Sequence, residues 1–481
     1  MINSLKFNDM NNYIAAIDLG TTKVVTLIGE KTESGIKIIA LREAPSKGVM
    51  RGEVVNIQNV LDSMLPLIED IKREHPIEIK EVYVGIAGQH IKCVTARISR
   101  NRGYSEELIS ENEVDEMMKE MANSRVNAGE KILHVIPQTY NVDDHIGVQS
   151  ATGMTGTRIE GDYKLFIGKI NSVEHSRLVI NRAGLKLKEL ILEPVASAKA
   201  VLTEDEMELG VAMVDIGGGT TDLLIYEDNI IRHTAVIPFG GNSITEDLRQ
   251  GCGVSLRNAE QIKIQYGSCY SEYAPDNKTV IIPGIGGRES REVSFKVIAG
   301  IIEARVDEII EAIMYEIENS GYKERLRAGI VITGGGGDLS NLCQYMRYRT
   351  GYDTRIAFPG NLSYDSPREA AKPSLATAVG LIMLGLESVE AEKRREAAKM
   401  EVQATSQNTG TLFEDVELVE ADNGKKRHGI KFRGLGGTKT KVPKEIKENK
   451  NNTGGDNRGS GNIFGSTIFD GIFGSTTNNE A

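Results

Sequence analysis

Residues 15–24 read Ala-Ala-Ile-Asp-Leu-Gly-Thr-Thr-Lys-Val, and a related stretch, Met-Val-Asp-Ile-Gly-Gly-Gly-Thr-Thr-Asp-Leu, occupies residues 213–223. In both, a short apolar run ends in aspartate, turns through glycine and threonine, and resumes as an apolar run. This pattern predicts a β-hairpin with a tight polar tip. Because the unit occurs twice, the sequence predicts two similar lobes that face one another. A third glycine cluster, Thr333–Asp338, follows the buried-strand pattern 329–332 and precedes a predicted helix.

The two tips carry the chemistry that a polyphosphate requires. Glycine lets backbone N–H donors approach phosphate closely, and threonine adds hydroxyl groups. Asp18 and Asp215 stand where the strands end, positions suited to holding Mg²⁺ through its waters, and Lys23 supplies a positive charge. The residues predicted to bind the phosphates are Gly20, Thr21, Thr22, Lys23, Gly217, Gly218, Gly219, Thr220 and Thr221.

One loop by itself is equally well an ordinary hairpin turn, so the prediction rests on the pair. The sequence contains no GxxxxGK[ST] and no GxGxxG after a strand, so it lacks the fingerprints of P-loop and Rossmann proteins.

Composition narrows the class of protein. A chain of 481 residues exceeds one compact core, and 40% hydrophobic with 26% charged residues is ordinary for a globular protein. A net charge of −11 argues against nucleic-acid binding. The four cysteines have no CxxC or metal-ligand spacing, which favours a reducing compartment. We expect no signal peptide, no run of roughly 18 apolar residues, and a cytoplasmic protein that meets a membrane only at its surface.

The two hairpin motifs, the glycine cluster and a predicted helix at Pro373–Gly380 occur in the order typical of the actin, sugar kinase and heat-shock chaperone superfamily. The chain resembles that superfamily in these motifs. The resemblance implies an α/β, two-lobed actin-like ATPase fold that binds ATP and Mg²⁺. It matches Glu193, in Leu192–Ala198, to a position that orients the attacking water. It further implies adenosine or ribose contacts from Glu260, Lys263, Gly334, Gly335, Gly336 and Gly337. From spacing alone, Glu260 and Lys263 are an ordinary surface pair on one helical face.

Within that superfamily, residues 14–386 resemble the FtsA family of bacterial cell-division proteins. The motifs are His134–Asp143 and Gly153–Glu160 in an inserted segment, and Phe239–Asp247 after the second hairpin. Residues 149–152, Gln-Ser-Ala-Thr, depart from the Asp-Pro that the family commonly shows. His134 lies among apolar residues and is interpreted as a packed structural histidine.

The inserted segment has its own elements. Strand patterns at 91–98 and 131–142 flank a helix that begins at Ser110, where Glu113 completes a capping box. The predicted division of the chain is 12–83 and 165–205 for the first lobe, 84–164 for the insert, and 206–386 for the second lobe, part of whose 365–386 helix returns to the first. A linker, acidic then basic, follows at 387–461, and a candidate membrane-targeting end at 462–481.

The C-terminal region predicts a two-part anchor. Residues 425–450 contain ten Lys or Arg and two Glu, a net charge of +8 that suits an anionic leaflet. Phe464, Ile468 and Ile472 share one helical face, which Phe469 and Phe473 widen, although three nearby glycines oppose a helix. The alternative is a disordered tail with a peptide motif for a protein partner.

The resemblance implies a cell-division protein at the cytoplasmic face of the membrane that tethers the FtsZ ring, forms a homopolymer and recruits other division proteins. Any ATP turnover is expected to be slow. The alternatives are an actin-like pilus-assembly protein and a metabolic kinase of the same superfamily.

Overall fold

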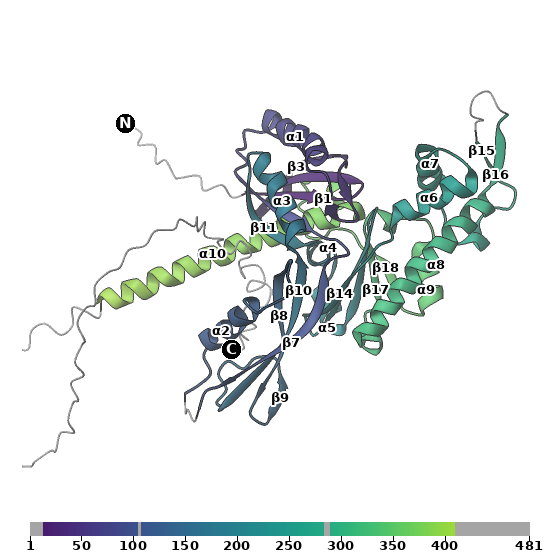
Figure 1. Ribbon diagram of the computed structural model, residues 1–481. Coiled ribbons are helices and arrows are strands. Elements are labelled where there is room, and N and C mark those ends of the chain that lie inside the picture. The colour runs from purple at the N-terminus through teal and green to yellow at the C-terminus, as the bar shows by residue number, and fades with distance from the viewer. Residues whose placement is uncertain (1–12, 104–106, 283–288, 409–481) are drawn as a thin grey trace, which may run out of the picture. The chain divides into compact units, whose positions relative to one another are not determined.

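The computed structural model of the chain describes residues 13–103, 107–282 and 289–408 (Figure 1). The first hairpin forms as predicted, because β1 and β2 pair antiparallel with Leu19 opposite Val24. It is part of a five-stranded sheet in the order β11-β6-β1-β2-β3, in which β1, β6 and β11 are parallel. The strands are β1 (Tyr13–Leu19), β2 (Lys23–Thr32), β3 (Gly35–Pro45), β6 (Glu81–Ile86) and β11 (Lys186–Leu192).

The second hairpin heads a sheet of the same plan. β12 and β13 pair antiparallel with Ile216 opposite Thr221, and the order β14-β13-β12-β17-β18 repeats two antiparallel and two parallel pairings. The predicted repeat of two similar lobes is therefore confirmed. The strands are β12 (Val211–Ile216), β13 (Thr221–Glu227), β14 (Ile230–Ile237), β17 (Ile330–Thr333) and β18 (Thr354–Ile356).

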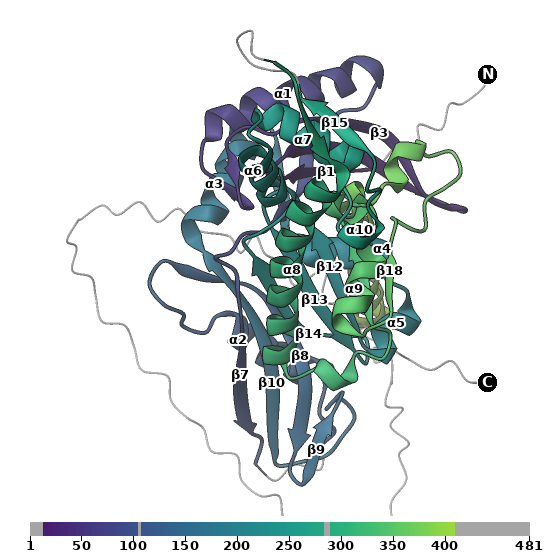
Figure 2. The same ribbon diagram turned by 90° about the vertical axis from the view of Figure 1, so that its right-hand side faces the viewer.

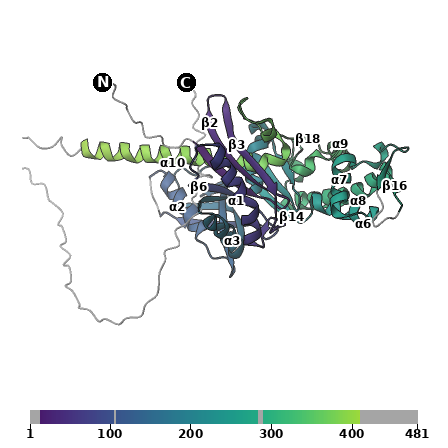
Figure 3. The same ribbon diagram turned by 90° about the horizontal axis from the view of Figure 1, so that it is seen from above.

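Helices cover both sheets. α1 lies across β2 and β3 (Figure 3), and α8 runs along β13 and β14 with α9 beside β18 (Figure 2). α4 and α5 lie against β13. The helices other than α2 and α10 are α1 (Ile57–Glu74), α3 (Ile170–Arg182), α4 (Glu193–Val201), α5 (Glu204–Leu209), α6 (Gly241–Cys252), α7 (Leu256–Tyr266), α8 (Phe295–Ser320) and α9 (Leu342–Thr350). Two short strand pairs complete this part of the fold, β4 (Val49–Met50) with β5 (Glu53–Val54) and β15 (Thr279–Ile282) with β16 (Arg291–Ser294).

The central strand of the second sheet is buried on both faces. Along β12, Val211 and Met213 pack into the core of the first lobe, whereas Ala212, Val214 and Ile216 pack into the core under α8. A strand covered on both sides needs apolar residues at every position, which explains the unbroken apolar run before the second glycine tip. The two lobes therefore share a continuous core behind the tips.

The insert is a four-stranded sheet, β7-β10-β8-β9, with α2 (Glu111–Ala122) packed on it. Its strands are β7 (Lys92–Asn101), β8 (Glu130–Val142), β9 (His145–Val148) and β10 (Arg158–Lys169). The expected insert boundaries at 84 and 164 fall inside β6 and β10, so β6 stays with the first lobe and the insert sheet runs on to Lys169. Gln138 Nε2 donates to Ile231 O of β14 at 2.9 Å, which ties the insert to the second lobe.

His134 of the insert is buried, as the sequence predicts for a packed structural histidine. Removal from water lowers the pKa of its imidazole from 6.5 to about 3, so the ring is neutral at physiological pH.

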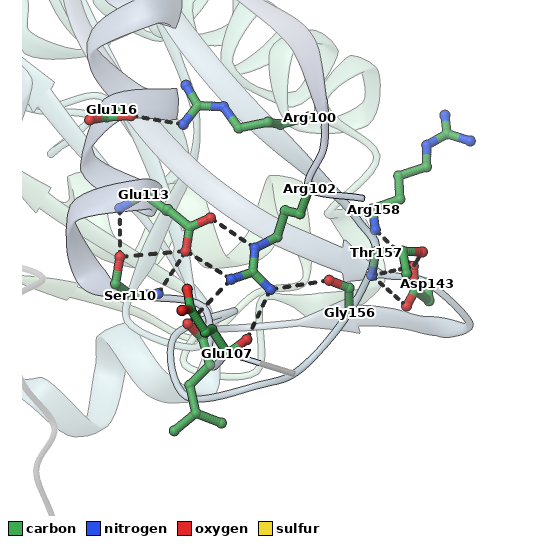
Figure 4. Close-up of polar contacts among 11 residues, drawn as sticks. Arg100, Arg102, Glu107, Ser110, Glu113, Glu116, Asp143, Gly156, Thr157 and Arg158 are labelled. Carbon is green, nitrogen blue, oxygen red and sulfur yellow. Dashed lines mark hydrogen bonds and ion pairs between the residues drawn. The ribbon is translucent and has the colours of Figure 1, made fainter. Parts of the chain in front are cut away.

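Arg102 ties the insert's turns together (Figure 4). Its guanidinium donates to both carboxylate oxygens of Glu113, at 2.8 and 3.2 Å, and to the backbone oxygens of Gly156, Glu107 and Leu108. Glu113 in turn accepts from the Ser110 backbone N–H, while Ser110 Oγ accepts from Glu113 N–H, which confirms the predicted capping box. A single buried guanidinium thus satisfies three backbone carbonyls and the helix cap.

Replacing Arg102 with alanine should loosen α2. The change removes the charged partner of Glu113 and the donor to three backbone carbonyls, so we expect the free energy of opening α2 to fall by about 2 kcal/mol. Hydrogen exchange of the α2 amides measures this quantity. Arg100→Ala is the matched control, because Arg100 pairs with the exposed carboxylates of Glu116 and Glu120 and should cost under about 1 kcal/mol. Equal effects of the two changes would contradict the role given to Arg102.

α10 (Ala376–Asn408) corrects two expectations. The helix expected at 365–386 begins at Ala376, after short 3₁₀ turns at Arg368–Ala371 and Pro373–Leu375. The linker expected from 387 does not begin there, since residues 387–408 continue the helix. The physical reason is composition, because the segment is rich in Glu, Ala, Lys and Arg, all good helix formers. Its first turns pack into the first-lobe core, as the returning helix was expected to do.

Part of the same helix is apolar enough by mean hydropathy to cross a membrane, although polar residues interrupt it and it contains no unbroken run of 18 apolar residues. For residues 373–394 the mean hydropathy is 1.4, but 67% of the window is buried in the protein. Its buried side chains, such as Ile382 and Leu384, belong to the first-lobe core. This burial is what a core helix shows, so length and hydropathy here are weak evidence for a membrane span.

Glu189, on β11, is buried at 4% exposure with one carboxylate oxygen lacking a hydrogen-bond partner among the described residues. Burial raises its pKa from 4.5 to about 8; Glu392 raises it further and Lys188 opposes the rise. Between those two pH values the unfolded chain releases this proton and the folded chain keeps it. Stability from this group is therefore lost as the pH rises from 4.5 to about 8.

Glu189→Gln should remove that pH dependence. We expect the free energy of unfolding at pH 8 to rise by about 2–4 kcal/mol relative to the unaltered chain, with a gain that shrinks toward pH 5. Urea denaturation at both pH values measures the difference. Glu78→Gln, at an exposed position, should change neither value. A gain independent of pH would contradict the burial explanation.

The predicted anchor residues Phe464, Ile468, Phe469, Ile472 and Phe473 lie outside the described residues, as does the basic tract at 425–450.

Candidate phosphate-binding site

The two glycine tips meet. A Cβ added at Gly218 would lie 2.2 Å from Thr22 Cγ2, and one added at Gly219 would lie 2.7 Å from Thr21 Cγ2. Glycine is therefore needed at the second tip because the first tip occupies the space of a side chain. The predicted residues 20–23 and 217–220 do come together.

Thr221 differs from the other predicted phosphate-binding residues. It lies in β13, is fully buried, and donates its hydroxyl to Phe239 O at 2.9 Å. Its side chain therefore holds the segment before α6 in place, while Thr21, Thr22 and Thr220 remain at the tips.

Asp18 and Asp215 are the second-last residues of β1 and β12, close enough to interact electrostatically, and each is 8% exposed. Asp215 Oδ2 accepts hydrogen bonds from Ser197 Oγ at 2.6 Å and Thr377 Oγ1 at 3.3 Å. Asp18 Oδ1 has no hydrogen-bond partner among the described residues. The hydroxyls of α4 and α10 thus orient one carboxylate and leave the other free to hold a ligand.

Two further acids belong to this group. Asp222 lies directly opposite Asp215 across the hairpin, on the same face, and is buried. Glu193 begins α4 and reaches β6, where a Cβ added at Gly85 would lie 2.8 Å from its Cγ. The sequence analysis gave Asp222 no role, although its place after the two threonines of a repeated motif is a usable signal.

Burial raises the pKa of all four acids, and repulsion from neighbouring carboxylates adds to the rise for three of them. Burial raises the pKa of Asp18 to about 7, where Lys23 opposes the rise and Asp215 adds to it. Burial and the neighbouring carboxylates raise the pKa of Glu193 and of Asp222 well above their usual values. Burial also raises the pKa of Asp215, against its hydroxyl bonds and Lys23.

Lys23 is the cation beside them. Its Nζ donates to Glu43 at 3.0 Å and to Ser374 Oγ at 3.3 Å. A bound cation would relieve the repulsion among the acids, and carboxylates are ligands that Mg²⁺ accepts directly or through water. In the described part of the chain no three acidic, His or Cys groups are close enough to chelate an ion directly. The carboxylates present are compatible with an ion that is held through its waters.

The glycine cluster after β17 packs against Asp215. Gly334 has φ of +83°, and a Cβ there would lie 2.2 Å from Asp215 Oδ1. Gly336 is equally confined by Ile216, at 2.3 Å. The expected helix after this cluster is a 3₁₀ turn, Gly335–Asp338, followed by α9.

Glu260 and Lys263 lie together on α7, as their spacing predicts, with Lys263 Nζ 2.8 Å from Glu260 Oε2. Lys263 also donates to Gly241 O at 3.0 Å, and Thr245 donates to Glu260. Gly241 N–H donates to Gly217 O of the second tip at 2.9 Å. The residues predicted to bind adenosine are thus more than a surface pair, since they are joined to the second glycine tip through the start of α6.

Comparison with known proteins agrees with this arrangement. Solved structures of similar fold include the PilM-PilN type IV pilus biogenesis complex, with a TM-score of 0.56 and 15% identity, covering 78% of this chain and 98% of that one. Another is MreB 5 of Spiroplasma citri bound to AMPPNP, with a TM-score of 0.50 and 15% identity, covering 80% of this chain and 99% of that one. The two lobes and the paired tips therefore define an actin-like protein.

Sequence comparison is more specific. Residues 212–380 match the family described as Cell division protein FtsA, and residues 88–167 match the SHS2 domain inserted in FTSA. Cell division protein FtsA of Neisseria meningitidis serogroup B is 37% identical over 372 residues, 77% of this chain and 89% of that protein. Cell division protein FtsA of Escherichia coli K12 is 33% identical over 399 residues, which cover 79% of this chain and 93% of that protein. The chain belongs to the FtsA family of cell-division proteins.

Proposed function

We propose that this division protein binds ATP with Mg²⁺ between its two glycine tips. The observation that carries the proposal is the contact of the Thr21–Thr22 tip with Gly218 and Gly219 above a set of buried, uncompensated carboxylates. Backbone N–H groups and hydroxyls of the tips bind the phosphates, and Lys23 neutralises part of their charge. Asp18 and Asp215 hold Mg²⁺ through its waters.

The other ligand contacts follow the same arrangement. Glu260 and Lys263, with residues 334–337, bind the adenosine, and Glu193 orients a water for slow hydrolysis. ATP acts chiefly as a structural and regulatory ligand, because a ligand that binds one state of the two lobes stabilises that state.

Membership of the FtsA family supports a finer proposal about partners. The chain tethers FtsZ polymers to the cytoplasmic face of the membrane, assembles with copies of itself and recruits other division proteins at the division site. The membrane contact is made by the basic tract at 425–450 and the apolar end, Phe464, Ile468, Phe469, Ile472 and Phe473.

Sedimentation with vesicles tests this function. In the presence of ATP and Mg²⁺, the full chain should carry FtsZ filaments onto vesicles that contain anionic lipid, and the chain ending at Gly461 should not. FtsZ pelleting in the absence of lipid checks that the shortened chain still binds its partner. Equal vesicle binding by the two chains would contradict the proposed membrane contact of the C-terminal region. Failure of the full chain to bind FtsZ would contradict the proposed tethering function.

A further inference from the structure

The two-residue turn beside the first tip contains an arginine, Arg51, in a backbone conformation that arginine rarely adopts. Arg51 and Gly52 join β4 to β5, and both have positive φ, +49° and +77°. Turns with two such residues favour Asn-Gly, because asparagine and glycine tolerate this conformation and most other side chains do not. A residue kept in an unfavourable conformation suggests that its side chain has a task there.

The backbone of this turn is held against the phosphate tips. Gly52 N–H donates to Thr21 Oγ1 at 3.2 Å, and a Cβ added at Gly52 would lie 2.9 Å from Gly88 N. Glu53, the next residue, lies 2.9 Å from His90 Nδ1 and accepts from Ser172 Oγ at 3.4 Å. These contacts hold the backbone of the turn, and the Arg51 side chain is exposed beside it.

Arg51 lines a pocket of about 510 Å³ that opens directly from the two tips. Its lining includes Thr21 and Gly219 of the tips, Met50 and Arg51 of the turn, and residues of α6. A polyphosphate held by both tips would therefore lie beside this pocket.

Two arginines line the pocket, and only Arg51 has no ion pair among the described residues. Arg305 is held by a bidentate pair with Asp247, at 2.6 and 2.9 Å, and the carboxylate of Glu246 is paired with Arg249. No ion pair occupies Arg51 within residues 13–103, 107–282 and 289–408. An arginine is always charged and presents a planar set of donors that suits two phosphate oxygens at once.

We propose that Arg51 binds the terminal phosphate of the nucleotide and so distinguishes a nucleoside triphosphate from a diphosphate. This inference rests on the proposed nucleotide site. A diphosphate held by the same tips ends before the pocket, so it gains nothing from Arg51. The turn would then couple the presence of the third phosphate to the Glu53–His90 contact at the base of the insert.

Arg51→Asn tests the proposal, because it removes the guanidinium and gives the turn its favoured Asn-Gly sequence. With Mg²⁺ present, we expect the affinity for AMPPNP to fall about tenfold and that for ADP to stay within about twofold. The unfolding temperature without nucleotide should be unchanged or higher. Arg51→Lys keeps a positive charge and should retain a good part of the preference.

Arg125→Asn, at an exposed position in the insert, is the control for a general loss of positive charge. An unchanged ratio of the two affinities in Arg51→Asn overturns the proposal, as does an equal loss for AMPPNP and ADP. If the unaltered chain binds neither nucleotide, the proposed function itself is wrong and the role of Arg51 falls with it. Binding of both nucleotides by the unaltered chain separates these two failures.

Discussion

Asp215→Asn is expected to stabilise the nucleotide-free chain and to abolish most of its response to ATP. Asparagine keeps the shape and still accepts from Ser197 and Thr377, but it removes one of four mutually repelling buried acids. The unfolding temperature without nucleotide should therefore rise by a few degrees. The affinity for ATP with Mg²⁺ should fall by about 10- to 100-fold, because the ion loses a carboxylate that holds its waters.

Thermal unfolding with and without ATP and Mg²⁺ measures both effects in one experiment. Asp365→Asn, at an exposed position, should alter neither the unfolding temperature nor its shift on ligand addition. Repeating the titration in EDTA should bring the unaltered chain close to the variant. ATP affinity that survives in Asp215→Asn would contradict the placing of the metal.

Among substitutions of described glycines by alanine, we expect Gly380→Ala to destabilise the chain most. A Cβ at this position of α10 would lie 1.7 Å from Ala196 O of α4, and a backbone oxygen cannot move aside by changing a rotamer. The helices must separate, which we expect to lower the free energy of unfolding by about 3 kcal/mol or more. Since α4 also carries Glu193 and Ser197, the response to nucleotide should weaken too.

Gly300→Ala is the matched control, because it makes the same change inside α8 where a Cβ meets nothing within 4 Å. It should stabilise the chain by about 0.5–1 kcal/mol through helix propensity. Urea denaturation of the two variants and the unaltered chain measures the contrast. Similar stabilities for the two variants would show that α4 and α10 do not cross as closely as described.

Features encoded within a short stretch were predicted well from sequence. The two hairpins depend on residues that are neighbours along the chain, and so does the cap of α2, where Ser110 and Glu113 are three positions apart. The family resemblance used the same local motifs. The linker boundary at residue 387 was wrong, because residues 387–400 are charged but also helix-prone, and α10 continues through them to Asn408.

Other features depend on residues far apart in the chain. Ser197 and Thr377 meet at Asp215 from α4 and α10, and nothing in their own surroundings marks them as its partners. Asp222 was visible in a motif but gained meaning only when the strand register set it opposite Asp215. Arg51 needed both its backbone conformation and the pocket before it stood out.

The sequence by itself therefore determined the two glycine tips, the inserted domain and the family, since each is specified by the order of adjacent residues. Only the tertiary structure decided that the tips touch, that four acids crowd behind them, and that an apolar helix is buried in the core. Those outcomes follow from packing between segments that are distant along the chain.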